Sequence, residues 1–339
     1  MQCQIDLLSR LRTPGAVRKA LSSLPSTLDK TYENLLERID GEEDKTLARK
    51  ILQILTFSLG PLSLIEISTM LQITPGMSTL DGSKCLTQPK DILDICGSLL
   101  RYNEKTGKVT LAHHSVKVYL TSASGNDVSY FKFNTQEAHR TIALLCLTYL
   151  SFDAFRTARD ETSSILREQY PFLDYATFHW ALHMKEVTDL RESLWSTLRT
   201  FLLSGDDGRH NFINWVRMLI PRSKNATSTP PLYYAASYGL TAVVKYLLSI
   251  GVDVEVHGGR GGATPINIAA YRGHLDVVKL LHKHGADPLK PDLSTKLNAI
   301  QWAYYEREWH VVDYFESEGY PTATAQGLPI IDRRPIGSG

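Results

Sequence analysis

Two histidine pairs have the residue type and spacing that could hold a metal ion. His113 and His114 are adjacent, and adjacent side chains on a strand point to opposite faces, so they cannot chelate one ion together. We expect His113 to make a hydrogen bond in the core instead. His179 and His183 lie one helical turn apart, which suits a metal, but zinc needs a third or fourth ligand and the sequence places no acid or thiol beside them. Both pairs are better explained by packing than by metal binding.

The sequence lacks the motifs of nucleophilic and nucleotide chemistry. No Gly-x-Ser-x-Gly elbow occurs, and no cysteine lies in a recognisable protease setting. A phosphate-binding loop needs G-x-x-x-x-G-K-[ST], and neither Gly82-Ser-Lys nor Thr106-Gly-Lys fits that pattern. We predict no catalytic residue and no cofactor. Because catalytic groups need to meet only in space, the alternative is an enzyme or small-molecule-binding protein with a pocket between a helical block and the repeats described next.

One pattern is written three times in the C-terminal third of the sequence. The copies span residues 230–253, 264–287 and 298–319. Pro231 and Pro265 lie 34 residues apart, and the glycines of the copies keep the same step. A fixed period of this length indicates a solenoid of stacked helical repeats.

The characteristic residues of the second copy each have a local structural role. Thr264 can cap a helix that begins at Pro265, where the missing N–H of proline costs nothing. Gly273 turns the chain, and Gly285 ends the second helix in a left-handed conformation. This spacing closely resembles the ankyrin repeat. Arg307 replaces the turn glycine in the third copy, as expected of a terminal repeat with one face in water.

The resemblance to ankyrin repeats implies a binding face for a protein partner. In ankyrin stacks, the two residues after the small-residue pair and the tips of the fingers face the concave side. Tyrosine recurs there in every copy and lies beside an arginine, which is the composition of a binding hot spot. The alternative is that these tyrosines only cover neighbouring repeats. The candidate partner-binding residues are Ser237, Tyr238, His257, Arg260, Tyr271, Arg272, Tyr305 and Glu306.

The region before the repeats predicts a winged-helix module. A helix over 46–59 is followed by a second helix that Ser63 and Glu66 should cap, and by a third over 92–99. An alternating hairpin then turns at Gly107. The third helix carries two aspartates and no lysine or arginine, so we expect no binding of nucleic acid.

The predicted fold is mostly α, with a winged-helix module that carries a small β-hairpin, a helical block and a C-terminal ankyrin-repeat solenoid. We expect the first repeat to bury its outer face on the helices of residues 190–219. The predicted domains are a helical N-terminal segment (1–45), the winged helix (46–122), the helical block (126–225), about three ankyrin repeats (226–320) and a flexible tail (321–339).

Three stretches resemble the region downstream of the NACHT domain in fungal NACHT–ankyrin proteins, a branch of the signal-transduction NTPases. They are Leu21–Tyr32, Leu111–Leu120 and Tyr175–His183, and Val118 departs from the family where an acid is common. The resemblance implies a non-catalytic interaction scaffold that lacks the NTPase motor. A separate NTPase chain is then a candidate partner.

Composition sets the remaining expectations. The chain has 339 residues, a formal net charge of +1, 43% hydrophobic and 22% charged residues, all ordinary for a globular protein. Four cysteines show no paired spacing, which favours free thiols in a reducing compartment. The longest apolar run, Ile142–Leu150, is about half of what a membrane crossing needs. We expect a cytoplasmic protein without membrane contact, and the nucleus stays open as a location.

Overall fold

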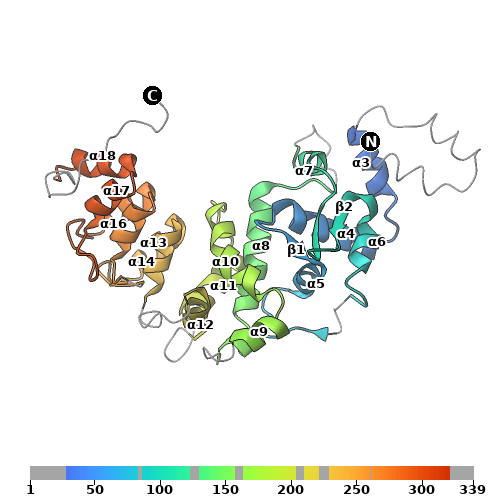
Figure 1. Ribbon diagram of the computed structural model, residues 1–339, viewed down its shortest axis with the longest axis horizontal. Helices are drawn as coiled ribbons and strands as arrows, with labels where there is room; N and C mark the ends of the chain where they lie inside the picture. Colours follow the sequence, from blue (N-terminus) through green and yellow to red (C-terminus); the bar gives the residue numbers. More distant parts are fainter. Residues whose placement is uncertain are drawn as a thin grey trace, which may run out of the picture. The chain divides into compact units, whose positions relative to one another are not determined.

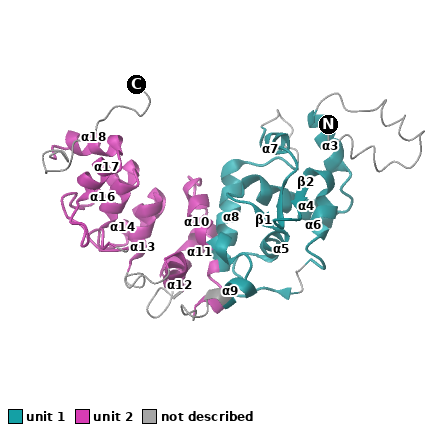
Figure 2. Cartoon of the chain, in the orientation of Figure 1, with its two compact units in different colours: residues 1–149, 165–176 teal, residues 150–164, 177–339 magenta. Residues whose placement is uncertain are grey.

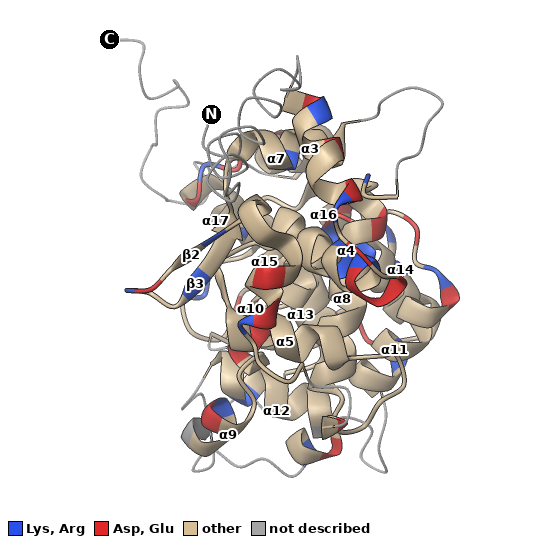
Figure 3. Cartoon of the chain, turned by 90° about the vertical axis from the view of Figure 1, so that its right-hand side faces the viewer, with Lys and Arg blue, Asp and Glu red and all other residues tan. Residues whose placement is uncertain are grey.

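The computed structural model describes residues 28–82, 86–122, 130–156, 163–203, 210–220, 229–259 and 261–320. The chain divides into two compact units, one of residues 1–149 and 165–176 and the other of residues 150–164 and 177–339 (Figure 2). The described structure is mostly helical and contains one small sheet, in the first unit (Figure 1). In the view of Figure 3, acidic and basic segments are interspersed over the helices, in keeping with the small net charge.

The first unit contains a three-stranded antiparallel sheet with the order β1-β3-β2, flanked by helices. Helix α3 lies in the N-terminal segment that was predicted to be helical, whereas residues 1–27 of that segment and the predicted flexible tail lie outside the described residues. The elements are α3 (Leu28–Glu37), α4 (Glu42–Phe57), β1 (Leu62–Ser63), α5 (Leu64–Gln72), α6 (Asp91–Cys96), η2 (Gly97–Leu99), β2 (Leu100–Asn103), β3 (Lys108–Leu111), α7 (His114–Thr121), α8 (Thr135–Leu150) and α9 (Ser163–Gln169).

The predicted cap of α5 and the predicted hairpin are both present. The Ser63 hydroxyl accepts from the Glu66 N–H at 3.2 Å, and the Glu66 carboxylate accepts from the Ser63 N–H at 2.7 Å. The same carboxylate binds the Lys108 ammonium on β3 at 2.9 Å. The hairpin of β2 and β3 turns at Gly107, whose φ is 65°. The capping box therefore fixes where α5 starts and also ties it to the sheet.

The expectation for His113 was wrong. Strand β3 ends at Leu111, and His114 is the first residue of α7, so the two histidines are not neighbours on a strand. The His113 side chain is exposed, and its Nδ1 accepts from the Ser115 N–H at 3.1 Å as the N-cap of α7. The first N–H groups of a helix have no partner within the helix, and the His113 ring supplies an acceptor for one of them. The histidine therefore lies at the exposed start of α7 and not in the core.

The second unit ends in three helix pairs with the spacing of the sequence repeat (Figure 1). The inner helices α13, α15 and α17 pack in series, and α14, α16 and α18 follow them as outer helices. The elements are η3 (Asp153–Phe155), α10 (Leu173–Lys185, which begins in the first unit), α11 (Glu192–Leu203), α12 (His210–Leu219), α13 (Pro231–Tyr238), α14 (Thr241–Ser249), α15 (Pro265–Tyr271), α16 (Leu275–Lys283), α17 (Ala299–Tyr305) and α18 (Trp309–Ser317).

The repeats use the predicted caps and turns. Thr264 accepts from the Asn267 N–H at 3.4 Å, and Asn298 makes the equivalent bond to the Gln301 N–H at 2.9 Å. Arg307 occupies the turn of the third copy with φ 64°, where the first two copies have glycine. The glycines of the copies that also have a positive φ are Gly239 (72°), Gly273 (70°), Gly251 (81°), Gly285 (92°) and Gly319 (84°).

Helix α12 covers the open side of the first repeat, as predicted. The Trp215 side chain is completely buried, and its indole N–H donates to the Thr177 carbonyl at 2.9 Å. Its ring lies 5.1 Å from Tyr234 of α13 and 5.3 Å from Trp180 of α10. This aromatic cluster, which we call the Trp215 cluster, also contains Phe201 and Phe212.

We predict that Trp215→Ala destabilises the protein by about 3–5 kcal/mol, because it empties the centre of this cluster and leaves a cavity. Chemical denaturation followed by near-ultraviolet circular dichroism measures the loss. Trp195→Ala is the matched control, since Trp195 is only half-buried and makes an edge contact with Tyr246. Equal losses for the two variants would contradict the placement of the core at Trp215.

We also predict that Arg307→Gly stabilises the protein by about 1 kcal/mol, because a side chain at positive φ is strained and glycine is not. The midpoint of thermal unfolding should rise. Arg307→Ala is the control, because it removes the charge and keeps the Cβ that causes the strain. Stabilisation by alanine as large as that by glycine would point to the charge instead.

Candidate functional site

A cavity of about 1080 Å³ lies within the second unit, against the inner helices of the repeats. The repeats contribute Tyr238, Tyr271 and Trp302 to its wall, and the end of α10 contributes Leu182 and Lys185. Its size is at the upper end of pockets that hold small molecules. The concave side of the repeats and the end of α10 thus form two walls of one space.

Half of the predicted partner-binding residues line this cavity. Ser237 and Tyr238 come from the end of α13, and Tyr271 and Arg272 come from the equivalent positions of α15. Tyr238 also packs on Trp215 with ring centroids 6.4 Å apart, and Tyr271 packs edge-on against Trp302 at 5.2 Å. These two tyrosines therefore both support the repeats and face the cavity.

The other four predicted residues are not among those that line the cavity. Tyr305 is 56% exposed, and Glu306 beside it is exposed as well. His257 is half-buried in the first finger, with its Nδ1 2.8 Å from the Gly262 carbonyl oxygen. Arg260 lies outside the described residues. The structure thus gathers the helix-end candidates of the first two repeats and leaves His257 of the first finger and the two candidates of the third repeat outside.

Sequence reasoning missed several lining residues. Tyr234 and Trp302 precede the predicted positions by about one helical turn, so helical periodicity could have found them. Asn267 precedes the predicted Tyr271 by four residues and could have been found in the same way, whereas Asp292 is a loop residue that carries no such signal. Lys185 lies on α10, which is far from the repeats in the sequence, so no local pattern could have connected this residue with the repeats.

Asp292 is the one described carboxylate in the cavity wall, and it is saturated with hydrogen bonds. It is 2% exposed. Its oxygens accept from the Ser294 N–H at 2.9 Å, the Thr295 hydroxyl at 2.5 Å and the Trp302 indole N–H at 2.9 Å. Burial acts to raise the pKa of this carboxyl, but these hydrogen bonds outweigh burial and hold the pKa below its usual range. Asp292 therefore joins the last finger to α17 and does not act as a free acid.

The remaining charges in the cavity wall are positive. Lys185 and Arg272 are exposed, and in the described part of the chain neither forms a salt bridge. The Arg272 guanidinium lies 5.4 Å from the centre of the Tyr271 ring. Burial lowers the pKa of His274, and the two cations lower it further. His274 is therefore neutral at pH 7, with its Nε2–H donating to the Ser237 carbonyl at 3.1 Å.

Asn267 contributes a buried acceptor to the same wall. Its side chain is completely buried, and its amide nitrogen donates to the Lys290 carbonyl at 3.1 Å. Its Oδ1 has no hydrogen-bond partner among the described residues. A buried oxygen left in this state costs free energy, so a bound molecule that donates a hydrogen bond to it would be favoured.

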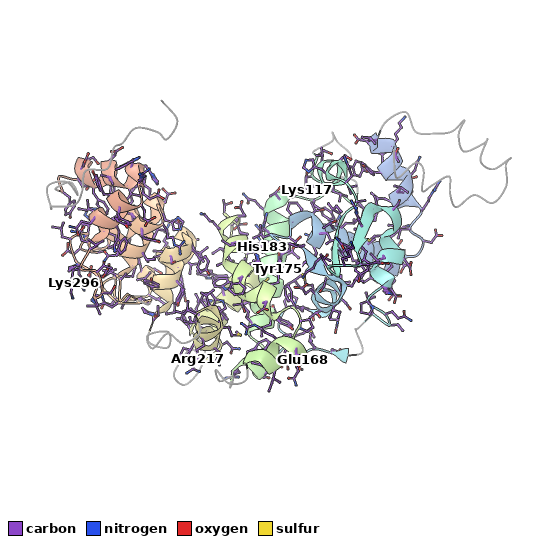
Figure 4. The ribbon with its side chains drawn as sticks, in the orientation of Figure 1. Lys117, Glu168, Tyr175, His183, Arg217 and Lys296 are labelled. Atoms are coloured by element: carbon purple, nitrogen blue, oxygen red, sulfur yellow. The ribbon has the colours of Figure 1, made fainter. Side chains whose placement is uncertain are left out.

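The two cysteines that the structure describes are not activated nucleophiles. Burial raises the pKa of the Cys96 thiol to about 12, and it raises that of Cys146 as well, so neither is a thiolate at neutral pH. His183 is completely buried on α10 (Figure 4). Among the described residues, no group of three histidine, cysteine or acidic side chains could hold a metal ion. No described helix is long and apolar enough to cross a membrane.

Comparison with known proteins identifies the repeats. A family model described as ankyrin repeats in three copies matches residues 207–292, which include α12 and the first two copies. The third copy follows this match and shares its caps and helix pair. The C-terminal part of the chain therefore consists of ankyrin repeats.

Two fungal proteins are similar over much of the chain. The azaphilone pigments biosynthesis cluster protein L of Monascus ruber is 27% identical over 296 residues, which cover 79% of this chain and 61% of that protein. The vegetative incompatibility protein HET-E-1 of Podospora anserina is 25% identical over 219 residues, or 57% of this chain and 15% of that protein. The chain thus spans less than two thirds of the length of either relative.

We predict that acidification destabilises the protein through His274. Its pKa is lowered in the folded state, so below its ordinary value of about 6.5 the unfolded chain binds more protons than the folded one. Stability is complete above that value and falls as the pH drops through it. Thermal unfolding between pH 7.5 and 5.5 should show the fall, and His274→Gln, which keeps an N–H for the Ser237 carbonyl, should flatten it.

His284→Gln is the control, because His284 is exposed at the end of α16. This variant should keep the pH dependence of the wild type. If the control flattens the curve as much as the replacement of His274, the pH dependence arises elsewhere.

Proposed function

We propose that this chain is a non-catalytic protein-interaction scaffold whose ankyrin repeats bind a protein partner through their concave face. The observation that carries the proposal is the cluster of Tyr238, Tyr271 and Arg272 on one hollowed surface. Tyrosine and arginine dominate binding hot spots, because each offers a large contact area together with hydrogen-bond donors. Arg272 is exposed and forms no salt bridge among the described residues, so its guanidinium is available to a carboxylate of the partner protein.

The names of the two relatives support a general interaction module. One is named for pigment biosynthesis and the other for vegetative incompatibility. Two processes this different are more readily connected by a shared way of binding proteins than by one shared reaction.

The resemblance to NACHT–ankyrin proteins refines the proposal. The element order α4-β1-α5-α6-β2-β3 supports our assignment of residues 46–122 to a winged-helix module. We assign 126–225 to a helical block and 226–320 to the repeats. In this proposal the chain acts in the cytoplasm, and a separate NTPase chain is a candidate partner. The module has no role in binding nucleic acid.

The second candidate function is the binding or conversion of a small molecule. The cavity and the lowered pKa of His274 favour it, since pockets with perturbed titratable groups are common at active sites. It ranks second because the two groups suited to acid–base chemistry are already engaged. Asp292 is saturated, and the Nε2–H of His274 is bound to a backbone carbonyl.

We predict that Arg272→Ala and Tyr271→Ala each weaken partner binding by about 2 kcal/mol, which is about 30-fold in Kd. Affinity capture from cells of the source organism identifies the partner, and calorimetry with the purified partner measures Kd. Arg272 is exposed, so its replacement should leave the midpoint of thermal unfolding unchanged. Tyr271 packs on Trp302, so its replacement should also lower that midpoint.

Lys283→Ala is the matched control, because Lys283 is an exposed cation on the outer helix α16. It should bind the partner as the wild type does. Full binding by Arg272→Ala together with a loss in Lys283→Ala would place the partner on the outer face and reject the concave face.

A further inference from the structure

The end of α10 gives the concave face a second wall. Phe178 and Leu182 are 44% and 41% exposed, and they share one face of α10 with Lys185. Leu182 and Lys185 line the cavity, and Tyr271 and Trp302 line it from the repeats. The space is therefore a groove with one apolar wall from each side.

The charges of the groove select an anion. Its charged or titratable side chains are Lys185, Arg272, His274 and Asp292, together with the phenols of its tyrosines. His274 is engaged with the Ser237 carbonyl, and Asp292 is enclosed by donors from its own loop and from Trp302. The two groups left to bind an occupant are the ammonium of Lys185 and the guanidinium of Arg272. A carboxylate complements both.

The buried oxygen of Asn267 adds a third requirement. Because the amide nitrogen donates to the Lys290 carbonyl, the Oδ1 atom is left without a hydrogen-bond partner among the described residues, and an occupant with an N–H donor would satisfy it. An occupant of this groove therefore has an N–H donor, a carboxylate and an apolar group. A peptide with an acidic side chain next to an apolar one provides all three on a short length of chain.

The two walls also decide the shape of the occupant. A folded domain can touch the exposed Arg272 from outside, but it is too large to enter the space of about 1080 Å³ that Leu182 and Tyr271 line. A single segment of chain can enter that space and use its main chain and side chains together. We propose that the groove between α10 and the inner repeat helices binds one acidic peptide segment of a partner protein, with an Asp or Glu side chain on Lys185 and Arg272 and an apolar side chain between Leu182 and Tyr271. This inference rests on the proposed function and adds the second wall and the class of ligand.

Selection from a displayed library of random peptides tests the charge. The full wild-type chain should enrich peptides with Asp or Glu beside an apolar residue. The double variant Lys185→Glu and Arg272→Glu should enrich peptides with Lys or Arg at those places instead. Circular dichroism and thermal unfolding show that the variant is folded; should it unfold, Lys185→Gln with Arg272→Gln takes its place and should lose the acidic preference. Selection without a charge bias, or a bias that the variants leave unchanged, would overturn the proposal.

Affinity measurements on the enriched acidic peptide test the second wall. Leu182 belongs to α10 and not to the repeats, so Leu182→Glu changes only the second wall. This substitution should weaken peptide binding by about 30-fold, because it removes an apolar contact and repels the carboxylate of the peptide. Ile250→Glu is the matched control, since Ile250 is 48% exposed at the end of the outer helix α14, and it should not change the affinity.

The outcomes separate this inference from the proposed function. Peptide binding that needs Arg272 and ignores Leu182 would keep the concave face and reject the groove. A partner that needs Arg272 while no selected peptide binds would show that a folded surface is recognised. A small aromatic carboxylate such as 1-naphthoate that displaces the peptide and binds more tightly would identify a small-molecule site. Each of these three results rejects the proposal that one acidic peptide segment is held between the two walls.

Discussion

The Trp215 cluster is the interaction on which the second unit depends. A short ankyrin stack exposes the apolar side of its first helix pair unless another element covers it, and α12 supplies that cover through Trp215 and Phe212. The indole N–H of Trp215 is satisfied by a carbonyl of α10, so one side chain joins α10, α12 and α13. The groove has two walls because this cluster holds those three helices together.

Polar bonds between neighbouring repeats then fix the register of the stack. His274 donates to the carbonyl of Ser237 in the preceding repeat, and His310 lies 2.9 Å from the carbonyl of Gly273. Gly239 has no room for a Cβ, which would lie 2.9 Å from the His274 ring. The close approach of these histidines to the turns links the stability of the stack to the protonation of His274.

The electrostatic character of the groove follows from which charges the fold satisfies. Five backbone and side-chain donors of the last finger surround the Asp292 carboxylate, so its charge is not available to an occupant of the groove. Lys185 and Arg272 have no comparable partners among the described residues. A chain with a net charge of +1 can therefore present a locally positive surface to an acidic partner.

The sequence by itself determined the features that depend on a few neighbouring residues. The capping box of Ser63 and Glu66, the turn at Gly107 and the repeat boundaries at Thr264 and Gly285 were all predictable, because caps and left-handed turns follow from local chemistry. The cap that His113 gives α7 is also local, because its partner is the Ser115 N–H, and it was missed because the helix start at His114 was not predicted. Only the tertiary structure decided that α10 lines the groove and that the indole N–H of Trp302 completes the donors around Asp292. Both features depend on groups that packing brings together from different elements, and a local pattern does not contain that information.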